Sequence, residues 1–255
     1  MSPFPKKTRP ERTARYVTGL HPIVEALTSG VTIDKIFLDS SVQRAFYKEL
    51  TQLALEHDVP YSCVPLVKLR RLCSSPSQGA VALLSPARFV SLEHVIQESY
   101  ALGQMPFVVL LDRVTDVHNF GAIVRTAICA GVDAIVVAKS HSAALGDDAM
   151  RTSAGALAHL PVARVDRLSS AIRYAQQCGL QVVACHERAA SDLYQIDFGM
   201  PLAVLLGAEG HGIAPQHLKM ADQQVKIPMT GPVASLNVSV AAALVMYERV
   251  RQHGL

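Results

Sequence analysis

The sequence lacks any long hydrophobic run: no apolar stretch among its 255 residues reaches the roughly 18 residues needed to span a bilayer. The basic residues Lys6 and Lys7 are not followed by the apolar segment of a secretory signal. The five cysteines form no Cys-x-x-Cys pair and no zinc-ligand spacing with histidine. We therefore expect a cytoplasmic globular protein with reduced cysteines, no membrane partner and no metal.

Glycine-rich nucleotide-binding turns are also missing. The first strongly apolar run, residues 107–111, is not followed by Gly-x-Gly-x-x-Gly, which argues against a nicotinamide dehydrogenase and against the common Rossmann methyltransferases. The glycines at 207–212 are not followed by Gly-Lys-Ser/Thr, so a triphosphate-binding loop is disfavoured. His118, His186 and His211 have no nucleophile or metal-ligand partner at a recognisable spacing, so we interpret them as structural or surface residues.

Positive charge is concentrated at the start of the chain. Residues 1–16 contain five basic residues and one acidic residue, a net charge of +4 in a chain whose total is +3. With three prolines, this segment is typical of a disordered basic tail attracted to a polyanion such as RNA. A solubilising terminus without a partner fits the same composition.

Two folded regions are predicted on either side of a linker. Residues 17–88 read as a small α/β domain, with helices near 21–29 and 42–57 and strands near 35–38, 61–64 and 80–84. Residues 89–105 are mixed in character and end before Pro106, so we place the interdomain linker there. Residues 106–255 contain apolar runs at 107–111, 134–138, 181–185 and 202–206 and helical patterns at 120–130, 168–178 and 237–252. This alternation predicts a parallel sheet covered by helices.

Candidate functional residues follow the strands, because parallel sheets bind ligands beyond the carboxyl ends of their strands. Asn119 and Arg125 follow the strand at 107–111, with Gly121 between them. The expected apolar stripe of this helix consists of Ile123, Val124, Ala127 and Ile128. Arg125 would then face outward beside the bare backbone of Gly121, where it could hold a phosphate or ribose. Alternatively, Asn119 caps the helix and Arg125 is a solvated surface residue.

Two further segments combine glycine or proline with polar residues. The strand at 202–206 runs into Gly207-Ala208-Glu209-Gly210-His211-Gly212, where exposed backbone could contact a ligand beside the Glu209 carboxylate. A flexible turn with a solvated Glu209 is the alternative. The third segment, from Ile227 to Ser239, includes Ser235, Leu236 and Asn237. Ser235 and Asn237 could simply be caps of the terminal helix.

Together these segments resemble the three ordered motifs of the SpoU methyltransferases, within the SPOUT superfamily. The matching patterns are Asn119-x-Gly121-x-x-x-Arg125, Gly207-Ala-Glu209-Gly210-x-Gly212 and Ile227-Pro228-Met229-x-Gly231-x-x-x-Ser235-Leu236-Asn237-x-Ser239. Upstream, Gly19-Leu20-His21-Pro22-x-x-Glu25-Ala26-Leu27 and Gln78-Gly79-Ala80-Val81 resemble the substrate-binding domain of the ribosomal guanosine 2′-O-methyltransferases.

The resemblance implies a trefoil-knotted α/β catalytic domain with a parallel sheet at 106–255, preceded by a small, ribosomal-protein-like α/β domain that binds RNA. It assigns S-adenosylmethionine contacts to Gly207, Ile227 and Leu236. It assigns chemistry or RNA placement to Asn119, Arg125, Glu209, Ser235 and Asn237. It also implies a homodimer whose sites are completed across the interface, to which Val240, Leu244 and Val245 of the terminal helix could contribute.

The implied reaction is methylation of the ribose 2′-hydroxyl of a guanosine in 23S ribosomal RNA. Transfer RNA is an alternative substrate, because the catalytic motifs are shared between the two groups of enzymes. A non-catalytic RNA-binding or ribosome-assembly protein with the same fold is the alternative from another functional class.

Overall fold

The computed structural model describes residues 16–29, 31–39, 44–57, 59–73, 77–85, 87–232 and 235–253. The chain divides into two compact units, residues 1–85 and 86–255. The basic tail predicted for residues 1–16 lies outside the described residues, apart from Tyr16. Within the described ranges no helix combines the length and the apolar character needed to cross a membrane. All five cysteines are unpaired.

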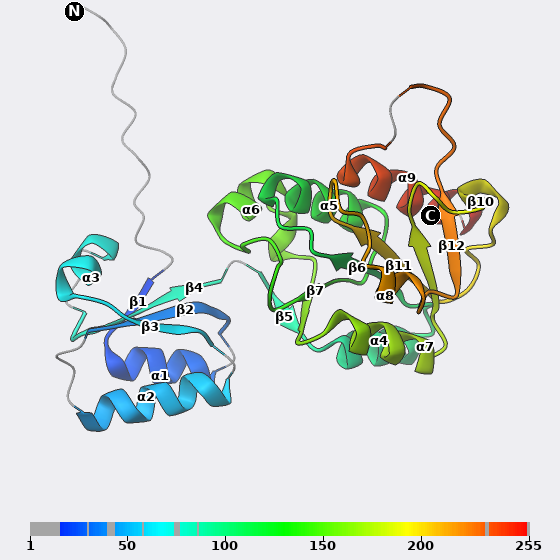
Figure 1. Ribbon diagram of the computed structural model, residues 1–255. Coiled ribbons are helices and arrows are strands. Elements are labelled where there is room, and N and C mark those ends of the chain that lie inside the picture. Colours follow the sequence, from blue (N-terminus) through cyan, green and yellow to red (C-terminus); the bar gives the residue numbers. More distant parts are fainter. Residues whose placement is uncertain are drawn as a thin grey trace, which may run out of the picture. The chain divides into compact units, whose positions relative to one another are not determined.

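The N-terminal unit is a four-stranded sheet with helices on both faces (Figure 1). Its elements are β1 (Tyr16–Thr18), α1 (Leu20–Thr28), β2 (Ile33–Leu38), α2 (Arg44–Glu56), β3 (Tyr61–Cys63), α3 (Leu66–Leu72) and β4 (Ala80–Leu84). The strand order is β1-β4-β2-β3, and of these pairs β2 and β3 are parallel. Ile23 of α1 and Leu50 of α2 pack with Ile36 of β2 in one core. The predicted small α/β domain is confirmed, and β1 and α3 are additional elements.

The C-terminal unit is built on an eight-stranded sheet in which every pairing is parallel. Its strands are β5 (Phe89–Val90), β6 (Phe107–Asp112), β7 (Ala134–Ala138), β8 (Val162–Val165), β9 (Gln181–Cys185), β10 (Ser191–Asp192), β11 (Leu202–Gly207) and β12 (Gln223–Lys226). Its helices are α4 (Leu92–Ala101), α5 (Val117–Cys129), α6 (Asp147–Thr152), α7 (Leu168–Gln177), α8 (Pro215–Leu218) and α9 (Val238–His253), with 3-10 turns η2 (Ala156–Ala158) and η3 (Leu193–Gln195). The predicted parallel sheet is confirmed.

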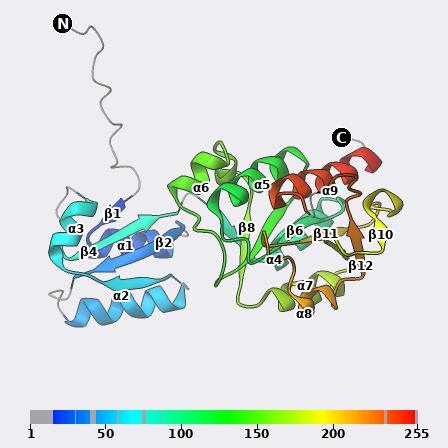
Figure 2. The same ribbon diagram turned by 45° about the horizontal axis from the view of Figure 1, so that its top comes forward.

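Burial of both sheet faces explains the continuous apolar strands. Along β6, Val109 packs in the core that contains α5 and α9, whereas Val108 and Leu110 pack in the core that contains α4 and α7. Successive strand residues point to opposite faces, so a strand covered by helices on both sides has few positions for polar residues. Figure 2 shows α5 and α9 side by side over the same face of the sheet.

The interdomain linker predicted at residues 89–105 is wrong. Strand β5 within this stretch pairs with β8 of the large sheet. Helix α4 begins at a Ser91 cap whose side chain accepts from the His94 backbone N–H, and its Val95 and Ile96 are buried under the sheet. A short amphipathic helix with a serine cap therefore belongs to the C-terminal unit, and the boundary between units lies between Ser85 and residue 86.

The strand order of the large sheet locates the place where a ligand can bind. The order is β10-β12-β9-β11-β6-β7-β8-β5, so the chain builds outward from β6 through β7 and β8 and then crosses to the other side of β6. A crevice opens beyond the carboxyl ends of the strands where such a reversal occurs. In this sheet the reversal lies at β6 and β11, at the positions of Asp112 and Gly207.

Candidate functional site

A cavity of about 430 Å³ lies at the carboxyl ends of β9 and β11. The three positions predicted to bind a cofactor, Gly207, Ile227 and Leu236, all line it. Glu209 and Ser235 line it as well. The volume is within the range of about 300–1,000 Å³ that is usual for small-molecule sites. The second and third sequence segments therefore meet in one pocket.

The loop after β11 folds back on its own backbone. The Gly212 N–H donates to the Ala208 carbonyl at 2.8 Å. A Cβ atom on Gly207 would lie 2.1 Å from the carbonyl carbon of Gly212, which is closer than any side chain can approach. Gly210 and Gly212 also have positive φ angles of 79° and 63°, a region that favours glycine. Glycine at these positions thus lets the main chain itself form the wall of the cavity.

A chain of hydrogen bonds joins the three sequence segments. Asn237 Nδ2 donates to Asn119 Oδ1 at 2.9 Å, and Asn119 Nδ2 donates to Glu209 Oε2 at 2.9 Å. These residues are separated by up to 118 positions in sequence. Because Glu209 lines the cavity, the chain of hydrogen bonds connects the start of α5 with the cavity wall.

The N-terminus of α9 sets the direction of these hydrogen bonds. The Ser239 backbone N–H, which can only donate, bonds to Asn237 Oδ1 at 2.9 Å. The amide nitrogen of Asn237 must then face Asn119, whose own amide nitrogen must face the carboxylate of Glu209. Asn237 thus caps α9 with its side-chain oxygen and bonds to Asn119 with its side-chain nitrogen.

Arg125 is not among the residues that line the cavity. It is exposed on α5, and its side chain has no hydrogen bond or ion pair with another residue in the part of the chain that the structure describes. Gly121, one turn earlier, does not expose bare backbone: a Cβ there would lie 2.0 Å from Thr152 Oγ1 of α6. The predicted open approach at Gly121 is therefore wrong, and this glycine allows close helix packing.

Three finer sequence predictions also need correction. Asp116, not Asn119, caps α5, because its side chain accepts from the Asn119 N–H at 2.7 Å. Ile128 is 37% exposed and is not part of the buried stripe. Asn237 rather than Ser235 lies directly before α9 and caps it. Because Asp116 caps the helix, the side chain of Asn119 is free to bond to Glu209 and Asn237.

The segment after β9 lines the cavity and was not predicted from sequence. It comprises His186, Glu187 and Arg188, and Cys185, the last residue of β9, lines the cavity beside them. Burial, followed by the nearby charge of Glu187, raises the pKa of the Cys185 thiol to about 12, so this thiol is protonated at neutral pH and is no nucleophile. His186 Nε2 lies 3.0 Å from Gln224 Oε1 of β12. The place of these residues at the carboxyl end of a buried strand was the signal that could have identified them.

The described residues contain no group of three or more His, Cys, Asp or Glu side chains able to hold a metal ion.

Comparisons with known proteins find similarity along most of the chain. Residues 106–247 match a family model described as the SpoU rRNA Methylase family, and residues 16–90 match one described as RNA 2′-O ribose methyltransferase substrate binding. A Staphylococcus saprophyticus protein classed with the TrmH family tRNA/rRNA methyltransferases is 35% identical over 236 residues. The match covers 92% of this chain and 95% of that protein.

Two solved structures extend the comparison. The SpoU methyltransferase AviRb from Streptomyces viridochromogenes, in complex with AdoMet, matches with a TM-score of 0.60 and 27% identity, over 93% of this chain and 89% of that chain. The A. aeolicus TrmH/SpoU tRNA modifying enzyme matches with a TM-score of 0.54 and 29% identity, over 63% of this chain and 83% of that chain.

Proposed function

Because this chain belongs to the SpoU rRNA methylase family, we propose that it methylates the ribose 2′-hydroxyl of a guanosine in 23S ribosomal RNA. Whatever its RNA substrate, the chain is an S-adenosylmethionine-dependent RNA 2′-O-methyltransferase. One observation carries the proposal: the chain of hydrogen bonds from Asn237 through Asn119 to Glu209 joins the first motif segment to the cavity that the second and third segments line.

The residues of the cavity suit S-adenosylmethionine. The backbone of the Gly207–Gly212 turn can approach a ligand closely because no side chain fits at Gly207. Ile227 and Leu236 supply apolar walls, and the carboxylate of Glu209 is complementary to a cationic ligand. When bound, S-adenosylmethionine supplies a methyl group made electrophilic by its sulfonium.

Catalysis by this chain rests mainly on alignment of the acceptor. Holding reacting groups at near-attack distance can supply roughly 7–11 kcal/mol of barrier reduction. We assign the placement of the target phosphate and ribose to Arg125, whose guanidinium is exposed. A guanidinium keeps its proton in water and is a poor base, so we assign Arg125 to positioning the nucleotide, and a phosphate oxygen can accept the hydroxyl proton.

The location of Arg125 supports a homodimer in which one protomer supplies this residue to the cavity of its partner. Helix α9 packs beside α5 and carries an outward apolar stripe of Val240, Leu244 and Tyr247, of which Val240 is 47% exposed. Val245, which the sequence suggested for this surface, is fully buried in the protomer's own core. In a knotted arrangement, the two loops at 207–213 and 227–237, which contribute residues to this cavity, would be threaded through one another.

Ribosomal RNA is favoured over transfer RNA by the N-terminal unit. Residues 16–90 match a substrate-binding model, whereas the similarity to the A. aeolicus tRNA modifying enzyme covers 63% of this chain. A non-catalytic RNA-binding protein is disfavoured because Asn119, Glu209 and Asn237 are present and joined by hydrogen bonds.

The direct test is transfer of tritium from labelled S-adenosylmethionine to purified RNA. We expect incorporation into 23S ribosomal RNA lacking the modification, recovered as 2′-O-methylguanosine after digestion, and little incorporation into transfer RNA. Preferential labelling of transfer RNA would favour the alternative substrate. Cofactor binding without labelling of either RNA, or of assembling ribosomal particles, would favour the non-catalytic alternative.

Replacing Asn119 by aspartate should make cofactor binding dependent on pH. The substitution sets a carboxylate against Glu209 Oε2, where the native amide nitrogen donates at 2.9 Å. Two close carboxylates raise the pKa of one of them, so repulsion operates at neutral pH and is relieved as pH falls through that raised pKa. Calorimetry should show weaker S-adenosylmethionine binding than wild type at neutral pH and a smaller difference at mildly acidic pH. Asn119→Ser is the uncharged control. Equal binding by Asn119→Asp and wild type at neutral pH would contradict a role of the Asn119–Glu209 hydrogen bond in cofactor binding.

A further inference from the structure

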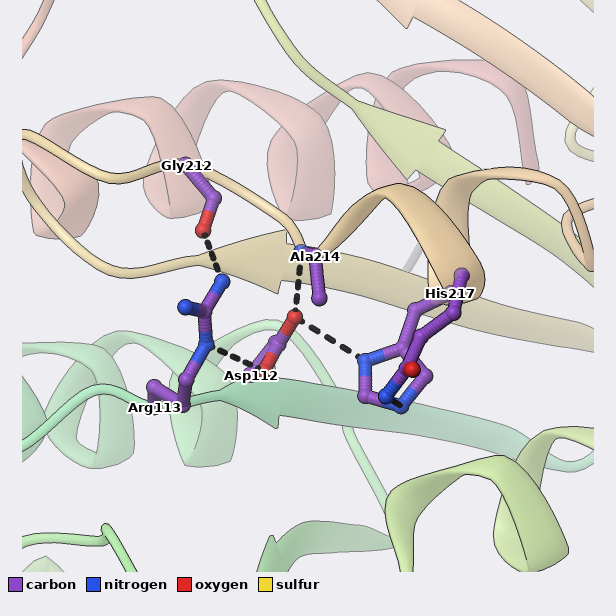
Figure 3. Close-up of polar contacts among 6 residues, drawn as sticks. Asp112, Arg113, Gly212, Ala214 and His217 are labelled. Carbon is purple, nitrogen blue, oxygen red and sulfur yellow. Dashed lines mark hydrogen bonds and ion pairs between the residues drawn. The ribbon is translucent and has the colours of Figure 1, made fainter.

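A second polar cluster lies beside the cavity wall, and Gly212 is its one member that belongs to the three motifs and lines the cavity. It consists of Asp112, Arg113, Gly212, Ala214 and His217 (Figure 3). Asp112 is the last residue of β6 and lies opposite Gly207 in the neighbouring strand β11. The cluster therefore sits directly under the loop that lines the cavity.

The Asp112 carboxylate accepts three hydrogen bonds. Its Oδ2 accepts from the Ala214 backbone N–H at 2.6 Å and from His217 Nδ1 at 3.0 Å. Its Oδ1 accepts from Arg113 Nε at 3.0 Å. The residue is 3% exposed, and a buried carboxylate is costly unless such donors surround it.

Arg113 extends the cluster to the loop itself. Its Nη2 donates to the Gly212 carbonyl at 3.2 Å. This carbonyl belongs to the peptide group that a Cβ atom on Gly207 would contact. Arg113 has a φ of 60°, which is uncommon for a residue other than glycine and persists where the surroundings fix it. The loop is thus held on two sides, at Gly212 through Arg113 and at Ala214 directly.

The charge of Asp112 is retained at neutral pH. Burial acts to raise the pKa of this carboxyl, but the Ala214 amide, His217 and Arg113 together lower it below its ordinary value. Ionised acceptors form stronger hydrogen bonds than neutral ones, so the carboxylate form holds the loop most firmly.

We propose that Asp112 is a positioning residue for the methyl donor: by fixing Gly212 and Ala214 it keeps the 207–213 loop in the shape that binds S-adenosylmethionine. This inference rests on the proposed function of the cavity. It predicts that Asp112 affects cofactor affinity beyond any effect on folding, although Asp112 is not among the residues that line the cavity.

The chain offers a matched control at the other end of the same strand. Asp133 Oδ2 accepts from the Phe107 N–H at 2.7 Å, so it too uses a carboxylate to fix backbone at an end of β6, but far along the strand from the cavity. Both Asp112→Asn and Asp133→Asn should lower the melting temperature. Calorimetry on folded protein should show about tenfold or greater loss of S-adenosylmethionine affinity for Asp112→Asn and wild-type affinity for Asp133→Asn.

Steady-state kinetics provide an independent readout, because Asp112→Asn should raise the KM for S-adenosylmethionine more than it lowers kcat.

If Asp112→Asn fails to fold, Arg113→Ala is the variant to measure. This side chain is 41% exposed, and its loss should weaken binding severalfold because it removes the hydrogen bonds to the Gly212 carbonyl and to Asp112 Oδ1. Equal affinities of the folded Asp112 or Arg113 variant and Asp133→Asn would overturn the inference while leaving the proposed function intact. Failure of the wild-type protein to bind S-adenosylmethionine would overturn both.

Discussion

Replacing Arg125 by alanine should lower the rate of methyl transfer to RNA by about 100-fold or more and leave S-adenosylmethionine affinity unchanged. The reason is that cofactor binding and acceptor placement use different residues, since Arg125 does not line the cavity. Its side chain is exposed on α5 and has no hydrogen-bond or ion-pair partner among the described residues. Turnover is measured by tritium transfer and affinity by calorimetry. Arg151→Ala, which removes another exposed arginine, is the control and should retain activity.

Mixing two inactive variants tests whether Arg125 acts across a dimer. A protomer with Arg125→Ala keeps its cavity, and a protomer with Gly207→Ala keeps its Arg125. If each site combines the cavity of one protomer with Arg125 of the other, co-expression should restore up to about a quarter of wild-type activity, because half of randomly formed dimers contain one intact site. No restoration in demonstrably mixed dimers would show that Arg125 serves its own protomer's cavity.

Replacing Gly207 by alanine should weaken S-adenosylmethionine binding by about 100-fold or abolish it. The added methyl would lie 2.1–2.5 Å from backbone atoms of Gly212 and Ile213, and these atoms cannot rotate away as a flexible side chain could. The loop must therefore move, and it forms the wall of the cavity. Binding calorimetry and thermal melting distinguish a displaced loop from an unfolded protein.

Gly146→Ala is the matched control for the added methyl. A Cβ at Gly146 meets no atom within 4 Å, and its φ of −95° is accessible to any residue. Wild-type binding by Gly146→Ala together with strong loss in Gly207→Ala would support the steric argument. Normal binding by a folded Gly207→Ala protein would contradict it.

The central strands could be predicted because they are buried on both faces. Strands β7 and β9 match the predicted runs at 134–138 and 181–185 residue for residue. Strand β12, with the sequence Gln-Gln-Val-Lys, was not predicted because it lies near the sheet edge and carries few apolar residues. Helix α4 was mistaken for a linker although Ser91 supplied a capping signal and Leu92, Val95 and Ile96 an apolar face.

The candidate site was predicted unevenly for a related reason. Sequence motifs predicted Asn119, Glu209 and Asn237 as site residues. The hydrogen bonds that join them depend on tertiary structure and on the capping of α5 by Asp116. Asp112 carried no recognisable signal, because a single aspartate after a strand has many uses. Its partners Ala214 and His217 lie 102 and 105 positions further along the chain.

The most direct test of the proposed activity is a map of 2′-O-methyl groups in the RNA of cells with and without this protein. The proposal predicts that loss of the protein removes one 2′-O-methylguanosine from 23S ribosomal RNA, and that wild-type protein restores it but the Arg125→Ala variant does not. An unchanged ribosomal RNA map, or loss of the methyl group from transfer RNA alone, would contradict the assignment to 23S ribosomal RNA.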